Sequence, residues 1–210
     1  MLTPLQRRLA QLLTSLPEAR DFALAGGAAL IARGIIDRGT QDLDFFATSA
    51  AAVADLLPVL EARLEAEGLS LTRIRDLPGF ARLQVAEPGG ETVQLDLSHD
   101  ARHGPTEATE LGFTLSRDEL AADKMLALFG RAEARDFADV AALLEVYSPD
   151  RLIELAGTKD LGFSQERFRE SLAAIHRLGE EDFLGTGRTY EDLASKFDAW
   201  REQLDQSRGS

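Results

Sequence analysis

Two aspartates, Asp42 and Asp44, stand two positions apart in the segment RGTQDLDFF, which begins at Arg38. Side chains of a strand alternate between its faces, so Leu43 and Phe45 would point into a core and both carboxylates to the opposite face. Two carboxylates that close repel one another unless cations bind. Divalent metal ions prefer such oxygen ligands. The segment therefore predicts a metal site. The ordinary alternative, a solvated strand face, is weakened because aspartate is disfavoured in strands.

A third carboxylate, Asp96, lies in the alternating run VQLDLS at residues 93–98. The apolar positions of this run form one face, and Asp96 lies on the opposite, polar face. Alone, Asp96 would be interpreted as a surface residue. If its strand neighbours the strand of Asp42 and Asp44, the three carboxylates complete the ligand set of a two-metal phosphoryl-transfer site.

A glycine pair, Gly26 and Gly27, stands between an apolar run and a helical segment. Glycine lets backbone N–H groups approach an anion closely, and a helix N-terminus adds partial positive charge. These features are typical of a phosphate-binding turn. On this evidence alone an ordinary tight turn is the more common explanation.

Further charged residues that are candidates for the site lie on segments predicted to be helices. Lys124 stands in the middle of one helix, where its ordinary interpretation is a surface lysine or the partner of a nearby aspartate. Arg135 and Asp139 are four residues apart on the next helix, so they share a face, and an ordinary local ion pair is one interpretation of them.

The elements that would position these residues are strands in the first half of the chain and helices in the second. Expected strands span residues 21–25, 42–46, 71–75, 80–86, 92–98 and 113–115, with a polar loop at 99–109. Expected helices span residues 4–16, 28–36, 50–67, 116–129, 135–147, 149–156, 164–178 and 189–206, and Pro58 is expected to kink or interrupt the third of these. This pattern predicts an α/β (α+β) fold. Residues 1–115 would form a core with a mixed, twisted sheet, and residues 116–210 a helical region that shares a cleft with it.

Composition limits the function classes. The 210 residues include no cysteine, which excludes disulfides and thiolate zinc sites. The formal net charge of -13 opposes broad nucleic-acid binding, although a local basic groove remains compatible with it. Arg73, Arg75 and Arg82 on the middle strands are candidates for such a basic rim. His99 and His103 could suggest a metal pair, but the segment between them is a polar loop without a helical pattern. No signal peptide and no apolar run of roughly 20 residues is present, so we expect a cytoplasmic protein without a membrane segment.

The ordered set of these motifs resembles the AbiEii/AbiGii toxin family of nucleotidyltransferases. That family includes the mycobacterial MenT toxins and belongs to the polymerase-β-like superfamily. The resemblance rests on the glycine pair, the Arg-x-Thr-x-Asp-x-Asp segment, the strand with Asp96, Lys124, and the Arg-Asp-x-x-Asp segment. The motifs extend from Gly26 to Asp139, about half of the chain.

The resemblance implies a role for each matching residue. Asp42 and Asp44 would bind Mg²⁺ (or Mn²⁺), with Asp96 as the third carboxylate. Gly26, Gly27 and Lys124 would contact the triphosphate, and Asp139 would match the last family motif. The remaining matches, expected to face the nucleotide or to support residues that do, are Arg38, Thr40, Arg135 and Asp136. One departure is that Gly27 and Ala28 supply no hydroxyl where the superfamily often has a serine, which puts one phosphate hydrogen bond in doubt.

The expected reaction is attack by an acceptor hydroxyl on the α-phosphate of a nucleoside triphosphate, with release of pyrophosphate. The resemblance implies that the acceptor is the 3′ end of tRNA and that the protein is a toxin with a cognate antitoxin. One alternative is transfer to a small, aminoglycoside-like molecule or to a protein hydroxyl, because a negative cleft attracts small cations. A second is a nucleotide-binding module without catalysis, which the intact aspartates disfavour.

Overall fold

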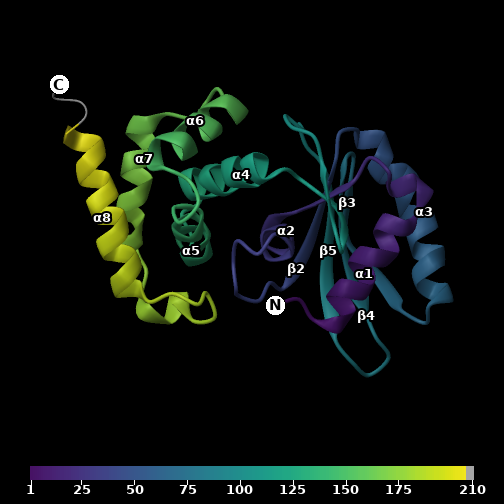
Figure 1. The fold of residues 1–210 in the computed structure, drawn as a ribbon. Helices are drawn as coiled ribbons and strands as arrows, with labels where there is room; N and C mark the ends of the chain where they lie inside the picture. The colour runs from purple at the N-terminus through teal and green to yellow at the C-terminus, as the bar shows by residue number, and fades with distance from the viewer. Residues whose placement is uncertain (207–210) are drawn as a thin grey trace. The chain divides into compact units, whose positions relative to one another are not determined.

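The computed structural model describes residues 1–206, which fold into two compact units (Figure 1). The first unit comprises Met1–Gly34 and Gly39–Ser116, and the second comprises Ile35–Arg38 and the chain from Arg117 onward. The last four residues of the helical region expected at 116–210 lie outside the described residues. The predicted mixed α/β fold is confirmed, because a sheet occupies the first unit and helices occupy the second. Within residues 1–206, no helix combines the length and apolar character that crossing a bilayer requires.

The first unit is built on a seven-stranded mixed sheet with the strand order β3-β4-β5-β2-β1-β7-β6. The strands are β1 Ala23–Ala25, β2 Asp42–Ala47, β3 Ser70–Leu77, β4 Phe80–Ala86, β5 Thr92–His99, β6 Glu107–Thr109 and β7 Gly112–Thr114. Strand β2 runs parallel to β5, and β4 and β5 form the predicted hairpin. The loop expected at 99–109 was wrong at its end, where β6 pairs with β7 and extends the sheet.

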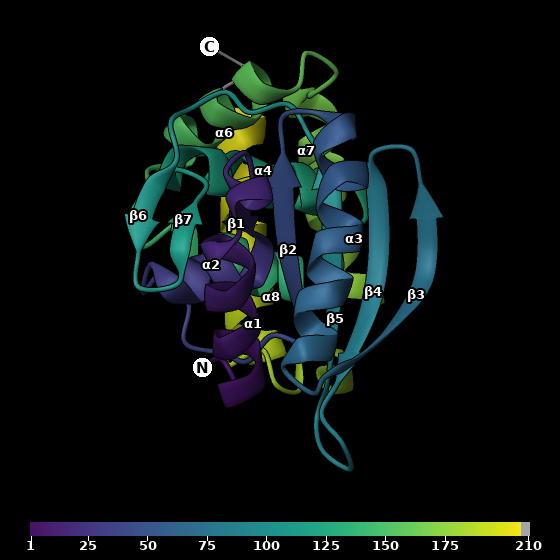
Figure 2. The ribbon, with the colours of Figure 1, turned by 90° about the vertical axis from the view of Figure 1, so that its right-hand side faces the viewer.

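Three α-helices belong to this sheet: α1 Pro4–Ser15, α2 Gly26–Ala32 and α3 Ala50–Ala66. Helices α1 and α3 lie on one face of the sheet (Figure 2), and α2 packs beside β1 and β2. The apolar residues of β2 and β5 alternate as expected, since Leu43, Phe45 and Leu95 are buried. Helix α3 continues through Pro58, so the expected interruption there was wrong. Buried leucines on both sides of Pro58, among them Leu57 and Leu60, hold the helix against the unit's core.

The second unit is helical. Its elements are α4 Arg117–Gly130, α5 Ala134–Leu143, α6 Pro149–Lys159, α7 Gln165–Leu172, the 3₁₀ segments η2 Ala173–Arg177 and η3 Glu180–Phe183, and α8 Tyr190–Gln206. Buried aromatic rings join α8 to the other helices. The ring centroids of Phe137 and Phe197 lie 5.0 Å apart, and those of Phe168 and Trp200 lie 5.2 Å apart. The apolar stripes that predicted these helices therefore form the core of this unit.

Candidate active site

The parallel pairing of β2 with β5 brings the strand carboxylates to one face of the sheet. Asp44 is the register partner of Asp96, and Asp42 lies two residues earlier, opposite Gln94. Side chains two residues apart in a strand share a face, so Asp42, Asp44 and Asp96 all emerge opposite the buried leucine face. Arg82 of β4 is the next register partner of Asp96. A row of charged residues thus crosses three adjacent strands.

Asp96 is held by a guanidinium fork. Arg82 donates from Nε to Oδ1 at 2.9 Å and from Nη2 to Oδ2 at 2.6 Å, while Asp96 itself is 6% exposed. The hydrogen bond to Asp96 raises the pKa of Arg82, burial opposes this rise, and the negative charges of Asp96, Asp44 and Asp42 add to it. All three carboxylates therefore act electrostatically on this one arginine.

These carboxylates offer the oxygen donors that Mg²⁺ or Mn²⁺ takes, so the residue types fit a divalent metal. However, no three His, Asp or Glu side chains within residues 1–206 gather closely enough to hold a metal ion. The strand register aligns Asp44 with Asp96, but both oxygens of Asp96 are bound to Arg82. The three-carboxylate cluster expected from the sequence stays a prediction for the metal-bound protein.

Gly26 makes room for Asp44. It has a φ of +60° at the start of α2, and a Cβ atom built on it would lie 2.0 Å from Oδ2 of Asp44. Glycine alone satisfies both conditions without strain, because it has no Cβ and tolerates the left-handed region. The sequence predicts that Gly26 and Gly27 approach a phosphate. The structure adds a second reason for glycine at position 26, because the carboxylate of Asp44, a candidate metal ligand, lies close to its backbone.

Thr40 fixes the orientation of Asp42. Its hydroxyl donates to Oδ1 of Asp42 at 2.8 Å. The backbone carbonyl of Thr40 in turn accepts from Nε2 of Gln6 at 2.8 Å. Gln6 also forms a capping box with Thr3 at the start of α1. The N-terminal helix therefore anchors the segment that leads into the aspartate strand. No sequence pattern marked Gln6 as part of this arrangement, because its partner lies 34 positions away.

In the second unit, a buried carboxylate joins two of the predicted residues. Asp139 on α5 is 0% exposed. It accepts from Nε and Nη2 of Arg38 at 2.9 and 2.8 Å, and Nζ of Lys124 lies 2.8 Å from its Oδ2. The expected local pair between Arg135 and Asp139 was therefore wrong. Asp139 instead binds partners distant in the sequence, and Lys124 is buried rather than a surface lysine.

Asp136 and Arg135 have partners beside α5. Asp136 is 0% exposed, accepts from the backbone N–H of Glu133 at 3.1 Å, and is bridged by Arg131 at 2.7 Å. It thereby caps the start of the helix. Arg135 is exposed and contacts Glu133 at 3.0 Å. The structure gives Asp136 a role in α5 itself, and the expected contact of both residues with a nucleotide stays a prediction.

The candidate basic rim is only partly assembled. Arg75 is the register partner of Arg82, and both guanidinium carbons lie 5.8 Å from the centre of the Phe80 ring. A bulge between Arg73 and Arg75 breaks the alternation of β3. Arg73 is therefore the register partner of Leu83, whose side chain lies on the buried face of the sheet, and it binds Glu61 of α3 at 2.6 Å. Its expected place beside Arg75 was wrong.

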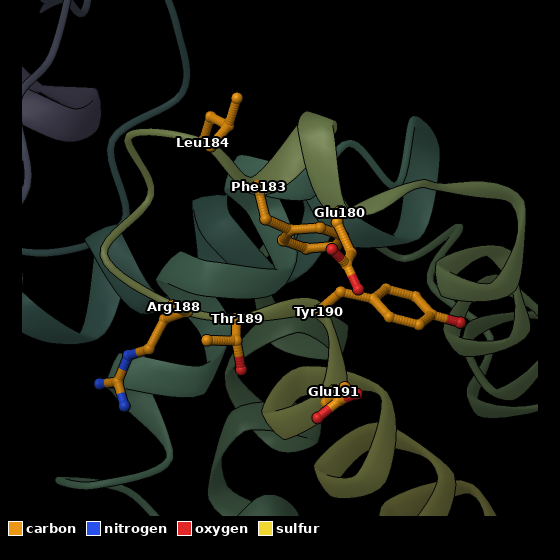
Figure 3. A pocket seen from close by; sticks show the side chains of 7 residues that line it. All are labelled: Glu180, Phe183, Leu184, Arg188, Thr189, Tyr190 and Glu191. Atoms are coloured by element: carbon orange, nitrogen blue, oxygen red, sulfur yellow. The ribbon is translucent and has the colours of Figure 1, made fainter.

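Neither of two cavities in the described residues contains a predicted site residue. The cavity in Figure 3, of about 390 Å³, belongs to the second unit and is lined by Glu180, Phe183, Leu184, Arg188, Thr189, Tyr190 and Glu191. A cavity of about 490 Å³ in the first unit lies between the start of α3 and the β3–β4 turn. The candidate site is therefore defined by aligned charged side chains rather than by these hollows.

Comparison with protein families matches residues 7–208 to the model described as the AbiEii nucleotidyl transferase toxin of type IV toxin–antitoxin systems. The search of curated proteins gives no significant sequence match. Among solved structures, the MenT4 nucleotidyltransferase toxin of Mycobacterium tuberculosis H37Rv superposes with a TM-score of 0.65 at 18% identity, covering 97% of this chain and 84% of MenT4. The JHP933 protein of Helicobacter pylori gives a TM-score of 0.56 at 17% identity, covering 99% and 100%. At these identities the structural likeness concerns the fold.

The contact between Gly26 and Asp44 can be tested with Gly34 as the matched control. Gly34 also has a positive φ, of +65°, but a Cβ there would meet nothing within 4 Å. We expect Gly34→Ala to lower the free energy of unfolding by about 1–2 kcal/mol through backbone strain alone, and Gly26→Ala to lower it further. Adding Asp44→Ala should recover only the extra loss at Gly26. Equal losses for the two alanine variants in denaturant unfolding would show that the close contact carries no energy.

The buried Asp139 gives a second stability prediction. Asp139→Asn removes the buried negative charge that Arg38 and Lys124 both bind, so we expect the free energy of unfolding to fall by about 3–5 kcal/mol. Glu154→Gln, which breaks an exposed pair with Arg151 in the same unit, should change it by less than about 1 kcal/mol. A small effect at Asp139, measured by denaturant unfolding, would contradict a structural role for this triad.

Proposed function

Because the chain belongs to the AbiEii family of nucleotidyltransferase toxins, we propose that it transfers a nucleoside monophosphate from a nucleoside triphosphate to an acceptor hydroxyl. Pyrophosphate is the second product of this reaction. The observation that carries the proposal is the alignment of Asp44 with Asp96 across β2 and β5, with Asp42 on the same face. A nucleotidyltransferase needs this carboxylate set where the triphosphate reacts.

The proposed metal ligands are Asp42, Asp44 and Asp96, with Mg²⁺ or Mn²⁺ as the cation. Bound there, the cation would neutralise charge on the reacting phosphate groups. The chain's own contribution is orientation. Thr40 fixes the carboxylate of Asp42 by a hydrogen bond, and Gly26 leaves the space that Asp44 occupies. Both devices restrict the side chains before any ligand binds, which reduces the cost of ordering them during the reaction.

The family resemblance supports triphosphate contacts for Gly26, Gly27 and Lys124. The ammonium group of Lys124 already has one carboxylate neighbour, Asp139, which Arg38 also binds. We propose that the ammonium group of Lys124 supplies the positive charge that a triphosphate requires. In this proposal Asp139 and Arg38 position Lys124, and Lys124 touches the substrate.

The proposed acceptor is the 3′ end of tRNA, as the family resemblance implies, and the proposed physiological role is that of a toxin with a cognate antitoxin. A tRNA acceptor would put the reaction in the cytoplasm. The net charge of -13 requires a local basic track for RNA. Arg75 and Arg82, which share a face with the aspartates, are candidates for that track. The small number of such arginines predicts a small footprint on the RNA.

The proposed reaction is tested by incubating the protein with each labelled nucleoside triphosphate, Mg²⁺ and total RNA. We expect label in tRNA, decreasing only gradually with added salt because few phosphates are contacted. Asp42→Asn and Asp44→Asn should lower the rate at least about a hundredfold, since a lost metal ligand removes several kcal/mol of charge stabilisation. Asp55→Asn, an exposed position on α3, is the charge-matched control.

Other outcomes of the same assay reject parts of the proposal. Label in a protein or in an added aminoglycoside, with none in tRNA, would replace the acceptor. No label in any acceptor at any salt concentration would favour a nucleotide-binding module without catalysis. Full activity of Asp42→Asn would remove that residue from the catalytic assignment.

Lys124→Ala tests the triphosphate contact separately. Loss of a charge-assisted hydrogen bond should weaken nucleotide binding or slow transfer by at least about tenfold. Lys196→Ala, at an exposed lysine of the same unit, should leave both unchanged. If Lys124 serves only to neutralise Asp139, the variant will lose stability in a thermal melt while its affinity for the nucleotide stays at the wild-type value.

A further inference from the structure

Arg82 occupies the ligand atoms that the proposed metal site needs from Asp96. Its Nε and Nη2 atoms reach both carboxylate oxygens, at 2.9 and 2.6 Å. The backbone register places Asp96 beside Asp44, yet the described residues contain no three-residue group able to hold a metal. The backbones are therefore aligned for a site that the side chains do not complete, and Asp96 is the carboxylate whose two oxygens already bind the guanidinium fork.

The charges along the row make Arg82 a substitute for a cation. Three carboxylates on one sheet face repel each other, and Arg82 is the positively charged register partner at the Asp96 end of the row. A bidentate guanidinium–carboxylate pair is among the stronger hydrogen-bonded contacts. A divalent ion that binds Asp96 must compete with this contact.

Arg82 can leave Asp96 without disturbing the core. Its side chain is 41% exposed, whereas that of Asp96 is 8% exposed. The guanidinium carbon also lies 5.8 Å from the centre of the Phe80 ring, two residues away on the same strand. A cation near an aromatic face is stabilised, and this contact is already present while Arg82 binds Asp96, so a guanidinium released from Asp96 can keep it.

We propose that Arg82 is a positioning residue that competes with the divalent cation for Asp96 and is released when the cation binds. This inference rests on the proposed metal-dependent function. It predicts that the wild-type chain binds the metal more weakly than its three carboxylates alone would. Arg82 keeps Asp96 ordered and partly neutralised until the metal arrives, and Asp96 becomes a ligand only when the fork opens.

The test measures Mn²⁺ affinity by calorimetry or electron paramagnetic resonance, on chelator-treated protein at about 0.15 M salt. Arg82→Gln should bind Mn²⁺ about tenfold more tightly, because the ion no longer displaces a charge-assisted contact. Arg82→Lys keeps the charge but loses the fork, so its affinity should be intermediate. Without metal, Arg82→Gln should melt at a lower temperature than wild type, because the carboxylates lose their cation.

Arg75→Gln is the matched control for charge. Arg75 is the register partner of Arg82 and contacts the same Phe80 ring, and the structure gives it no carboxylate ion-pair partner among residues 1–206. Its removal changes the net charge equally, but Arg75 lies one strand further from Asp96 than Arg82 does and does not bind Asp96, and salt weakens its effect. We expect its Mn²⁺ affinity to stay within about twofold of wild type. An equal gain in Arg75→Gln and Arg82→Gln would contradict competition for Asp96.

A purely structural role for Arg82 predicts the opposite sign. If the arginine only supports the sheet, Arg82→Gln will bind Mn²⁺ as weakly as wild type or more weakly, and the inference is wrong. Asp44→Asn separates this failure from that of the proposed function. If Asp44→Asn abolishes Mn²⁺ binding while Arg82→Gln shows no gain, only the inference about Arg82 fails. If Asp44→Asn binds Mn²⁺ normally, the metal site itself is wrong.

Discussion

Three carboxylates emerge on one face of the sheet of the first unit, and their mutual repulsion is the constraint that the surrounding residues of the candidate site must meet. The parallel pairing of β2 with β5 sets Asp44 beside Asp96, an arrangement that needs compensating interactions. Arg82 supplies a positive charge to Asp96, and Gly26 supplies space for Asp44. In the proposed function, the same three carboxylates bind a divalent cation.

The second unit handles buried charge differently. Asp139 has no exposed surface, and both Arg38 and Lys124 bind its carboxylate. Arg38 is part of the short segment Ile35–Arg38, which clusters with this unit although its sequence neighbours belong to the sheet. The chain thus leaves the first unit after α2, contributes one arginine to the second, and returns to enter the aspartate strand. The Asp139 triad therefore depends on a segment that directly precedes Asp42 and Asp44.

Strict alternation of side chains made much of the sheet predictable. Leu43 and Phe45 indicated which face β2 buries, and the hairpin of β4 and β5 followed from its turn residues. Two failures have local physical causes. The bulge in β3 places the side chains of Arg73 and Arg75 on opposite faces of the sheet. The residue types of this strand do not indicate where such a bulge occurs. Helix α3 continues through Pro58 because its buried leucines outweigh one lost backbone hydrogen bond.

Long-range ion pairs were the hardest feature to predict. A spacing of four residues favoured a pair between Arg135 and Asp139. Asp139 instead binds Arg38, which is 101 positions away in the sequence. Likewise, the sequence suggested Arg82 only as a candidate for a basic rim, because its contact with Asp96 depends on which residues of β4 and β5 are opposite each other. Sequence patterns predict the face on which a charge lies, whereas tertiary register decides what it binds.

The most direct measurement is a crystal structure of the chain with Mn²⁺, in which anomalous scattering locates the ion. We predict a peak coordinated by oxygens of Asp42, Asp44 and Asp96, with the guanidinium of Arg82 withdrawn from Asp96. A peak bound elsewhere, or bound to Asp42 and Asp44 while Arg82 still covers both oxygens of Asp96, would contradict the proposed three-carboxylate site.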